Sequence, residues 1–164
     1  MRFNLVDRIT EWQPSKSLKG VKYLTLAEEY LADHFPTFPV MPGVLMLEAI
    51  VEASAWLWRI TTGFKHSVIV LRDAKNVKYG TFMEPGRAMD IAVELVKVEG
   101  ALATFRGKGN VQQGGAQTVS AQVVLNAYNI SDKNPSAVSV DERLISHFRE
   151  RFAWLSGELL RPAI

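Results

Sequence analysis

The sequence predicts an α+β fold in which one antiparallel β-sheet curls around a single long helix. Residues 43–61 form a helix pattern that is apolar on nearly all sides, and such a helix must be enclosed by other parts of the protein. From Ser67 onward, apolar and polar residues alternate with a period of two, which is typical of half-buried antiparallel strands. A chain of 164 residues, 48% of them hydrophobic, favours one domain with a single core.

Two short strands are expected before the helix, at residues 1–12 and 20–27, joined by a turn around the segment QPSKSLKG. The following segment, AEEYLADHFPTFP, contains prolines that forbid a helix from about His34 onward.

The long helix is expected to begin at Pro42-Gly43, because proline suits the first helical turn, where its missing N–H costs nothing. Gly63 is expected to end this helix at Thr61 or Thr62.

Three or four long strands are expected after the helix. The alternation is clearest at residues 89–95 and 118–125. Glu99-Gly100 and Gly114-Gly115 lie between strand-like segments and are predicted hairpin turns, because glycine accepts a positive φ.

The composition changes after Ile130, where the segment SDKNPSAVS indicates a linker. Ser139 and Glu142 then form a predicted capping box at the start of a last helix. Apolar residues follow at helical spacing: Leu144, Phe148, Phe152, Leu155 and Leu159. We therefore divide the chain into a domain at 1–130 and a linker with a C-terminal amphipathic helix at 131–164. This helix is expected to dock on the domain or on a partner subunit.

Several classes of function are disfavoured by composition. The chain has no cysteine, which excludes disulfides and thiolate metal sites. His66 and His147 have no ligand spacing with His34, so no metal site and no cofactor are expected. No basic run is interleaved with aromatic residues, so nucleic acid is not an expected partner.

The apolar run from Val40 to Trp58 is long enough to raise the question of a membrane span. Glu48 and Glu52 lie at its middle, however, and a carboxylate near the bilayer centre costs about 2.5–3.5 kcal/mol. A buried core helix is the favoured interpretation. The first ten residues lack the apolar core of a signal peptide, so a cytoplasmic protein is expected.

The net charge of +2 is unevenly distributed. Residues 59–108 carry nine basic and five acidic side chains, a net charge of +4. This segment can attract an acidic partner, although a set of solvated strand faces explains the charge equally well.

Two glutamates on the apolar helix are candidates for acid catalysis. Burial disfavours an ionised carboxylate, so the pKa of Glu48 is expected to rise, which suits a group that holds a proton and then donates it. Glu52 lies one turn further along the same face, and two carboxyls so close discourage double ionisation. The alternative, that this stripe faces solvent or pairs with a lysine, stays open from the residues alone.

His34 is the candidate base. A lone histidine in a proline-rich loop is more often a packed or surface residue, but beside a buried acid it can take a proton from carbon. The backbone N–H groups from Gly43 onward lack intrahelical partners and can stabilise negative charge on a carbonyl oxygen. These three elements describe removal of a proton next to a carbonyl with loss of a β-hydroxyl.

The segment HFPTFPVMPGVLMLEAIVEA, residues 34–53, closely resembles the signature of the 3-hydroxyacyl-acyl-carrier-protein dehydratases of type II fatty-acid synthesis, the FabZ type. In that signature a catalytic Glu follows the His by fourteen positions, as Glu48 follows His34, and Pro42 and Gly43 are in register. The segment VKYGTFMEPG, residues 77–86, looks like the family's later strand and turn. The resemblance covers roughly residues 5–129.

The resemblance implies a hot-dog fold, an antiparallel sheet wrapped around the central helix, paired into a homodimer that can assemble further as a hexamer, a trimer of dimers. It implies that His34 of one subunit faces Glu48 of the other in a tunnel at their interface. His34 would then be the base, Glu48 the acid that assists departure of the hydroxyl, and the Gly43 N–H the group that polarises the thioester carbonyl. An acidic acyl-carrier protein would deliver the 3-hydroxyacyl chain, without a metal or cofactor.

The chain departs from the family pattern in ways that suggest a divergent member. Thr37 and Phe38 stand at the usual Gly and its variable neighbour, and the loop is expected to differ if that Gly needs a positive φ. Glu52 stands where the family usually has Gln, and Phe82 where Pro is common. Two other functions stay open: a hot-dog acyl thioesterase, in which a carboxylate activates water, and a non-catalytic module that binds acyl-carrier protein.

Overall fold

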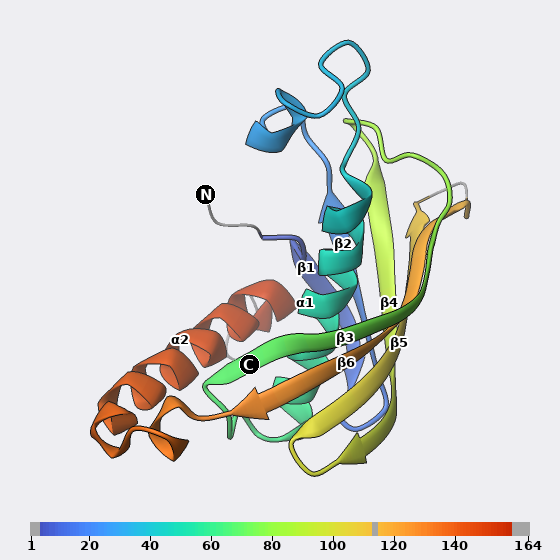
Figure 1. The fold of residues 1–164 in the computed structure, drawn as a ribbon. Helices are drawn as coiled ribbons and strands as arrows, with labels where there is room; N and C mark the ends of the chain where they lie inside the picture. The colour runs from blue at the N-terminus through green and yellow to red at the C-terminus, as the bar shows by residue number, and fades with distance from the viewer. Residues whose placement is uncertain (1–3, 113–114, 159–164) are drawn as a thin grey trace.

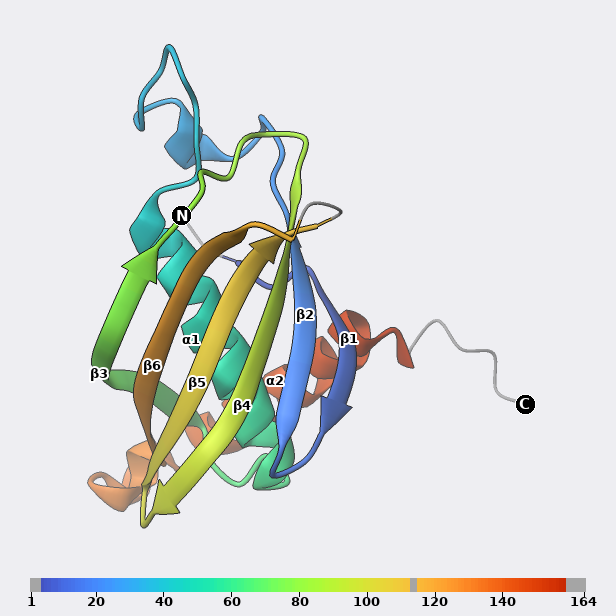
Figure 2. The ribbon, with the colours of Figure 1, turned by 90° about the vertical axis from the view of Figure 1, so that its right-hand side faces the viewer.

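The computed structural model describes residues 4–112 and 115–158. Its main feature is a six-stranded antiparallel sheet with the strand order β1-β2-β4-β5-β6-β3. The strands are β1 Arg8–Gln13, β2 Ser17–Tyr23, β3 Val68–Tyr79, β4 Ala88–Glu99, β5 Leu102–Val111 and β6 Gln117–Tyr128. The long helix α1, Gly43–Thr61, lies against one face of the curved sheet (Figures 1 and 2). The predicted α+β class is confirmed.

Helix α1 is enclosed because its residues are apolar on most sides. Ala49, Ile50, Ala53 and Leu57 have no exposed surface. Strand β5 comes very close to α1 at Gly107, where a Cβ atom would lie 2.3 Å from Cγ2 of Ile50. The sheet can therefore curl around the helix only because this position has no side chain.

The ends of α1 agree with the sequence prediction. Pro42 is the N-cap, and Thr62 is the C-cap. Gly63 follows with a φ of +63°, the left-handed conformation with which helices commonly end.

The predicted boundaries of the first two strands were wrong. Strand β2 begins at Ser17, within the predicted turn, and ends at Tyr23 rather than at residue 27. Leu18 is buried, so the chain returns to the core sooner than the polar residues around it indicate. Strand β1 spans Arg8–Gln13, and the first three residues of the predicted strand lie outside the described part.

The predicted hairpin turn at Glu99-Gly100 joins β4 to β5, and Gly100 has a φ of +60°. Of the second predicted turn, Gly114 lies outside the described residues, whereas Gly115 has a φ of +68° and precedes β6. The four strands after α1 agree with the predicted three or four.

Two short 3-10 turns, η2 Ile130–Asp132 and η3 Pro135–Ala137, lead into a second helix, α2 Val138–Ser156. The predicted capping box at Ser139 and Glu142 was wrong, because the N-cap of α2 is Ala137, two residues earlier, and it has no side-chain cap. The turn η3 runs directly into the helix, which leaves no extended residue to act as a polar cap.

Asp141, in the first turn of α2, is buried and joins the helix to the linker. Its carboxylate accepts hydrogen bonds from the N–H groups of Ile130 and Ser131, at 2.9 Å each, and from the Ser67 hydroxyl, at 2.5 Å. Burial alone would raise the pKa of Asp141, but the hydrogen bonds from Ser131, Ser67 and Ile130 outweigh it and hold the pKa well below its ordinary value.

Helix α2 docks on its own chain, one of the two predicted alternatives. The Phe152 ring packs edge-on against Trp12 of β1, with 5.3 Å between centroids, and Phe148 packs against Trp56 of α1 at 5.9 Å. Figure 1 shows α2 on the same side of the sheet as α1. Leu159, the last residue of the predicted apolar face, lies outside the described residues. The division of the chain at residue 130 stays a prediction.

Candidate active site

His34 lies in the loop between the 3-10 turn η1, Glu29–Leu31, and α1. It is half-buried, and its backbone N–H donates to the carbonyl of Tyr30 at 3.1 Å. Its ring Nδ1 lies 2.9 Å from the carbonyl oxygen of Val40. Because a carbonyl only accepts, Nδ1 carries a proton and donates it. In the neutral tautomer that this hydrogen bond selects, the lone pair lies on Nε2.

The backbone around His34 is unusual at Phe35. This residue has a φ of +53°, which is uncommon for a residue other than glycine. Its carbonyl accepts the N–H of Phe38 at 2.8 Å, and its ring contacts the His34 ring at 4.5 Å between centroids. The positive φ falls at Phe35 and not at Thr37, so Thr37 itself does not adopt a glycine conformation. That this loop differs from the one in the family stays a prediction.

Gly43 begins α1, so its N–H has no carbonyl one turn earlier in the helix. The Tyr79 ring lies over this position, 3.1 Å from where a Cβ would be. The N–H of Met41 donates to the carbonyl of Met83 at 2.9 Å, which attaches the approach to the helix to the segment before β4. The helix start is therefore attached to the rest of the domain, and a side chain at Gly43 would press against the Tyr79 ring.

Glu48 and Glu52 lie on one face of α1 and share a pocket of about 220 Å³ between α1 and α2. Burial raises the pKa of Glu48. Burial also raises the pKa of Glu52, to about 7, assisted by the charge of Glu48 and opposed by the N–H of Leu5, which donates to Oε2 at 3.0 Å. Neither carboxyl forms an ion pair within the described part of the chain. Among these residues, the alternative in which the glutamates pair with a lysine is therefore not observed.

The predicted base and acid do not line a common pocket among the described residues of one chain. The pocket that Glu48 lines does not include His34 or Gly43 among its described lining residues. The loop that carries His34 extends beyond the N-terminal end of α1 (Figure 1).

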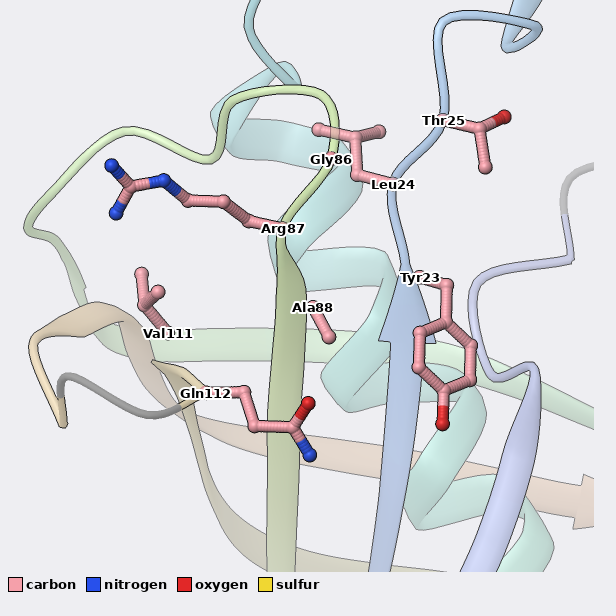
Figure 3. Close-up of a pocket in the computed structure, with 8 residues that line it drawn as sticks. All are labelled: Tyr23, Leu24, Thr25, Gly86, Arg87, Ala88, Val111 and Gln112. Atoms are coloured by element: carbon pink, nitrogen blue, oxygen red, sulfur yellow. The ribbon is translucent and has the colours of Figure 1, made fainter.

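A larger, open hollow of about 640 Å³ lies where β2 ends, β4 begins and β5 ends (Figure 3). Tyr23, Arg87 and Gln112 are among the residues that line it. Arg87 pairs with Glu84 at 3.2 Å. The described residues that line this hollow include no carboxyl and no imidazole, so they offer no acid–base pair.

Sequence reasoning missed three residues that line the pocket with Glu48: Arg59, Phe148 and Arg151. Arg59 lies two turns beyond Glu52 on the same face of α1, a spacing that could have revealed it. Phe148 and Arg151 come from α2, and only the packing of the two helices brings them here.

No group of three or more histidine, aspartate or glutamate side chains within residues 4–112 and 115–158 is arranged to hold a metal ion. Over the same residues, no helix is both long and apolar enough to cross a bilayer.

A family model described as the FabA-like domain matches residues 1–122, well over half of the chain. The chain belongs to the FabA-like family. Among curated proteins, this FabA-like chain is 32% identical over 136 residues to 3-hydroxyacyl-acyl-carrier-protein dehydratase FabZ from Janthinobacterium sp., covering 81% of this chain and 86% of that protein. It is 35% identical over 122 residues to the FabZ dehydratase of Bacillus subtilis, covering 74% and 81%. The predicted resemblance is confirmed.

Solved structures resemble the FabA-like chain in fold. A chain of the dehydratase heterocomplex ApeI:P from Xenorhabdus doucetiae superposes with a TM-score of 0.65 at 14% identity, covering 78% of this chain and 85% of that one. A hypothetical thioesterase from Streptococcus pneumoniae, solved with coenzyme A, gives a TM-score of 0.55 at 12% identity, covering 73% and 84%. These identities support the fold alone, and the predicted hot-dog fold is confirmed.

Proposed function

We propose that this FabA-like chain converts (3R)-3-hydroxyacyl-acyl-carrier-protein to the trans-2-enoyl thioester and water. The observation that carries the proposal is the contrast between the environments of two groups. The hydrogen bond from Nδ1–H of His34 to the Val40 carbonyl leaves Nε2 of the neutral ring to accept a proton, and burial raises the pKa of Glu48, as suits a proton donor. A dehydration needs one group that accepts a proton and another that donates one. The FabZ relatives carry this activity in their names.

In the proposed reaction, Nε2 of His34 takes the proton from C2 of the acyl chain. The electron pair of the broken C2–H bond forms the C2–C3 double bond. The C3–O bond breaks as Glu48 gives its proton to the hydroxyl, which leaves as water. The Gly43 N–H donates to the thioester oxygen while negative charge develops there. The imidazolium and carboxylate that remain return to their starting forms by proton transfer from His34 to Glu48 through water.

The proposal includes a homodimer in which His34 of one subunit acts with Glu48 of the other. Within a single chain, His34 is not among the described residues that line the pocket of Glu48. Around the start of α1, the large apolar side chains of Phe35, Phe38, Val44, Tyr79 and Phe82 are each at least 50% exposed. Large apolar side chains exposed in one region are typical of a protein interface. Assembly of three such dimers into a hexamer would be detected by light scattering.

The proposed partner is an acyl-carrier protein, an acidic protein that the positive segment 59–108 would attract. The proposal places the reaction in the cytoplasm, with the carrier-bound chain as substrate.

The test is an assay with 3-hydroxyacyl-carrier-protein of several chain lengths, following enoyl absorbance and free thiol together. Enoyl product without thiol supports the dehydratase. Thiol release indicates a thioesterase, and neither signal indicates a binding module; both results contradict the proposal.

The matched variant for this assay is His34→Asn. Its side-chain amide can still donate to Val40, so the loop is kept, but no basic nitrogen replaces Nε2. We expect the rate to fall about 10²- to 10⁴-fold with an unchanged melting temperature. Full activity of this variant would refute the role of His34 as base.

A further inference from the structure

The pocket between α1 and α2 contains a cation that the proposed reaction does not use. Arg59 lines this pocket and is only 6% exposed. Its guanidinium lies over the Phe148 ring at 3.8 Å and near the Trp56 ring at 5.5 Å. The two rings hold the charged group in place, and neither supplies a negative charge.

Arg59 has no anionic partner among the residues that the structure describes. Its Nε is buried without a hydrogen-bond partner, and no carboxylate of residues 4–112 or 115–158 pairs with it. Burial lowers the pKa of Arg59 to about 10, against the opposing effect of Glu52, so the side chain is still charged at neutral pH. A buried and unpaired cation is unfavourable, and an incoming anion would relieve this.

The neighbours of Arg59 do not neutralise it. Glu52 accepts the Leu5 N–H, and its pKa of about 7 leaves it partly protonated at neutral pH. Arg151 adds a second positive charge to the pocket and donates to Oδ1 of Asn4. Even with Glu48 ionised, the two arginines and the partly protonated Glu52 leave the pocket with an excess of positive charge.

The pocket is continuous with the proposed reaction site. Glu48 and Arg59 both line it, and eleven residues of α-helix separate them by about 16 Å along the axis. Helix α2 supplies Phe148 and Arg151 at the Arg59 end, and α2 lies beyond the segment that the family model matches. An acyl chain with its C3 hydroxyl at Glu48 can therefore direct its far end toward a cation that α2 covers.

We propose that this pocket selects 3-hydroxyacyl chains whose far end carries a carboxylate, which pairs with Arg59. This inference rests on the proposed function and names its substrate class. A methyl-ended chain would bury its end beside Arg59 and leave the cation unpaired. A carboxylate would accept the N–H groups of Arg59, and charge-assisted hydrogen bonds of this kind are the strong ones.

The test compares acid-ended and methyl-ended chains of matched length over a series of lengths. Pantetheine thioethers, which cannot react, give the affinities by calorimetry, and the corresponding 3-hydroxyacyl-carrier-protein substrates give kcat/KM. We expect the wild type to prefer the acid-ended probe by about 10- to 100-fold at the best length. Arg59→Gln should abolish this preference and retain affinity for the methyl-ended probe.

The matched control is Arg143→Gln. Arg143 is exposed on α2, donates to the Ser139 carbonyl and does not line the pocket, so the preference should stay as in the wild type. If Arg59→Gln fails to fold, Arg151→Gln tests the same pocket through its second cation and should reduce the preference.

The outcomes separate this inference from the proposed function. Equal or better binding of the methyl-ended probe by the wild type, or an unchanged preference in the pocket variant, overturns the inference. Turnover of methyl-ended chains with no acid preference would leave the dehydratase proposal intact. Tight binding of the acid-ended probe without any enoyl formation would support the pocket and contradict the dehydratase proposal.

Discussion

At the scale of single residues, Glu52 is the carboxyl whose environment most clearly opposes its charge. Its pKa is raised from 4.5 to about 7, first by burial. Between these two values the unfolded chain loses the proton that the folded chain keeps, so stability falls as the pH rises through this window. The unfolding free energy lost over this window is at most about 3 kcal/mol.

Glu52→Gln removes this ionisation and places at this position the residue that FabZ dehydratases usually have. We expect the variant and the wild type to have similar unfolding free energies near pH 4.5. The variant should become more stable than the wild type as the pH rises to 8. Urea denaturation at a series of pH values measures the difference, and Glu142→Gln, on the exposed face of α2, controls for the loss of one carboxyl. A constant difference across this pH range would contradict the assigned environment.

The sequence could indicate His34, Glu48 and Gly43 because they lie within one short segment whose pattern is local. The upward shift of the Glu48 pKa could be predicted from the place of this residue on an apolar helix. Arg59 lies on the same helix face, but the burial of its guanidinium depends on Phe148, almost ninety residues away, whose ring covers it. Such a contact arises from tertiary packing, and no local pattern shows it.

At the scale of elements, periodicity predicted the helices and strands well because each has one face toward a common core. The errors occurred at element ends. Strand β2 was placed too late because Leu18 is a single large apolar side chain in a polar segment. The start of α2 was misjudged because Ala137, and not Ser139, is its N-cap, while Asp141 in the first turn accepts hydrogen bonds from Ile130 and Ser131. The end of a helix or strand depends on a few hydrogen bonds, whereas its middle shows the same periodic pattern of apolar residues over several turns or residue pairs.

The contact of β5 with α1 yields a prediction at this scale. Gly107→Ala would place Cβ 2.3 Å from Cγ2 of the buried Ile50, so the helix or the strand must shift. We expect a loss of about 1–3 kcal/mol in unfolding free energy, measured by urea denaturation. Lys108→Ala, an exposed change at the next position, should stay within about 0.5 kcal/mol of the wild type. Equal effects of the two changes would contradict this packing.

At the scale of the whole molecule, the described chain has unused surfaces that a second copy can cover. Strand β3 is an edge of the sheet, with Val70 and Leu71 each 41% exposed, and an open edge presents unpaired N–H and C=O groups. The rings of Phe38 and Phe82, 5.8 Å apart between centroids, extend the apolar surface near the start of α1. A dimer interface is formed by side chains from two chains, and no pattern within one chain shows which of them meet. The sequence therefore indicated a homodimer only through its resemblance to the dehydratase family.

The proposed shared site predicts complementation between two inactive variants. His34→Ala lacks the base and Glu48→Ala lacks the acid, so each homodimer should be nearly inactive. When the two are unfolded and refolded together in equal amounts, half of the dimers contain one of each chain, and one of the two sites in such a dimer is intact. About a quarter of the wild-type rate of enoyl formation should return.

The matched control for this complementation refolds His34→Ala with a chain that carries both substitutions, because no dimer in that mixture has an intact site. Mass spectrometry of intact dimers made from chains of different mass verifies the exchange of subunits. If mixed dimers form and the rate does not recover, His34 and Glu48 do not act across the interface. Recovery in the test mixture and none in the control would place the acid and the base on different chains, because neither variant can supply both groups by itself.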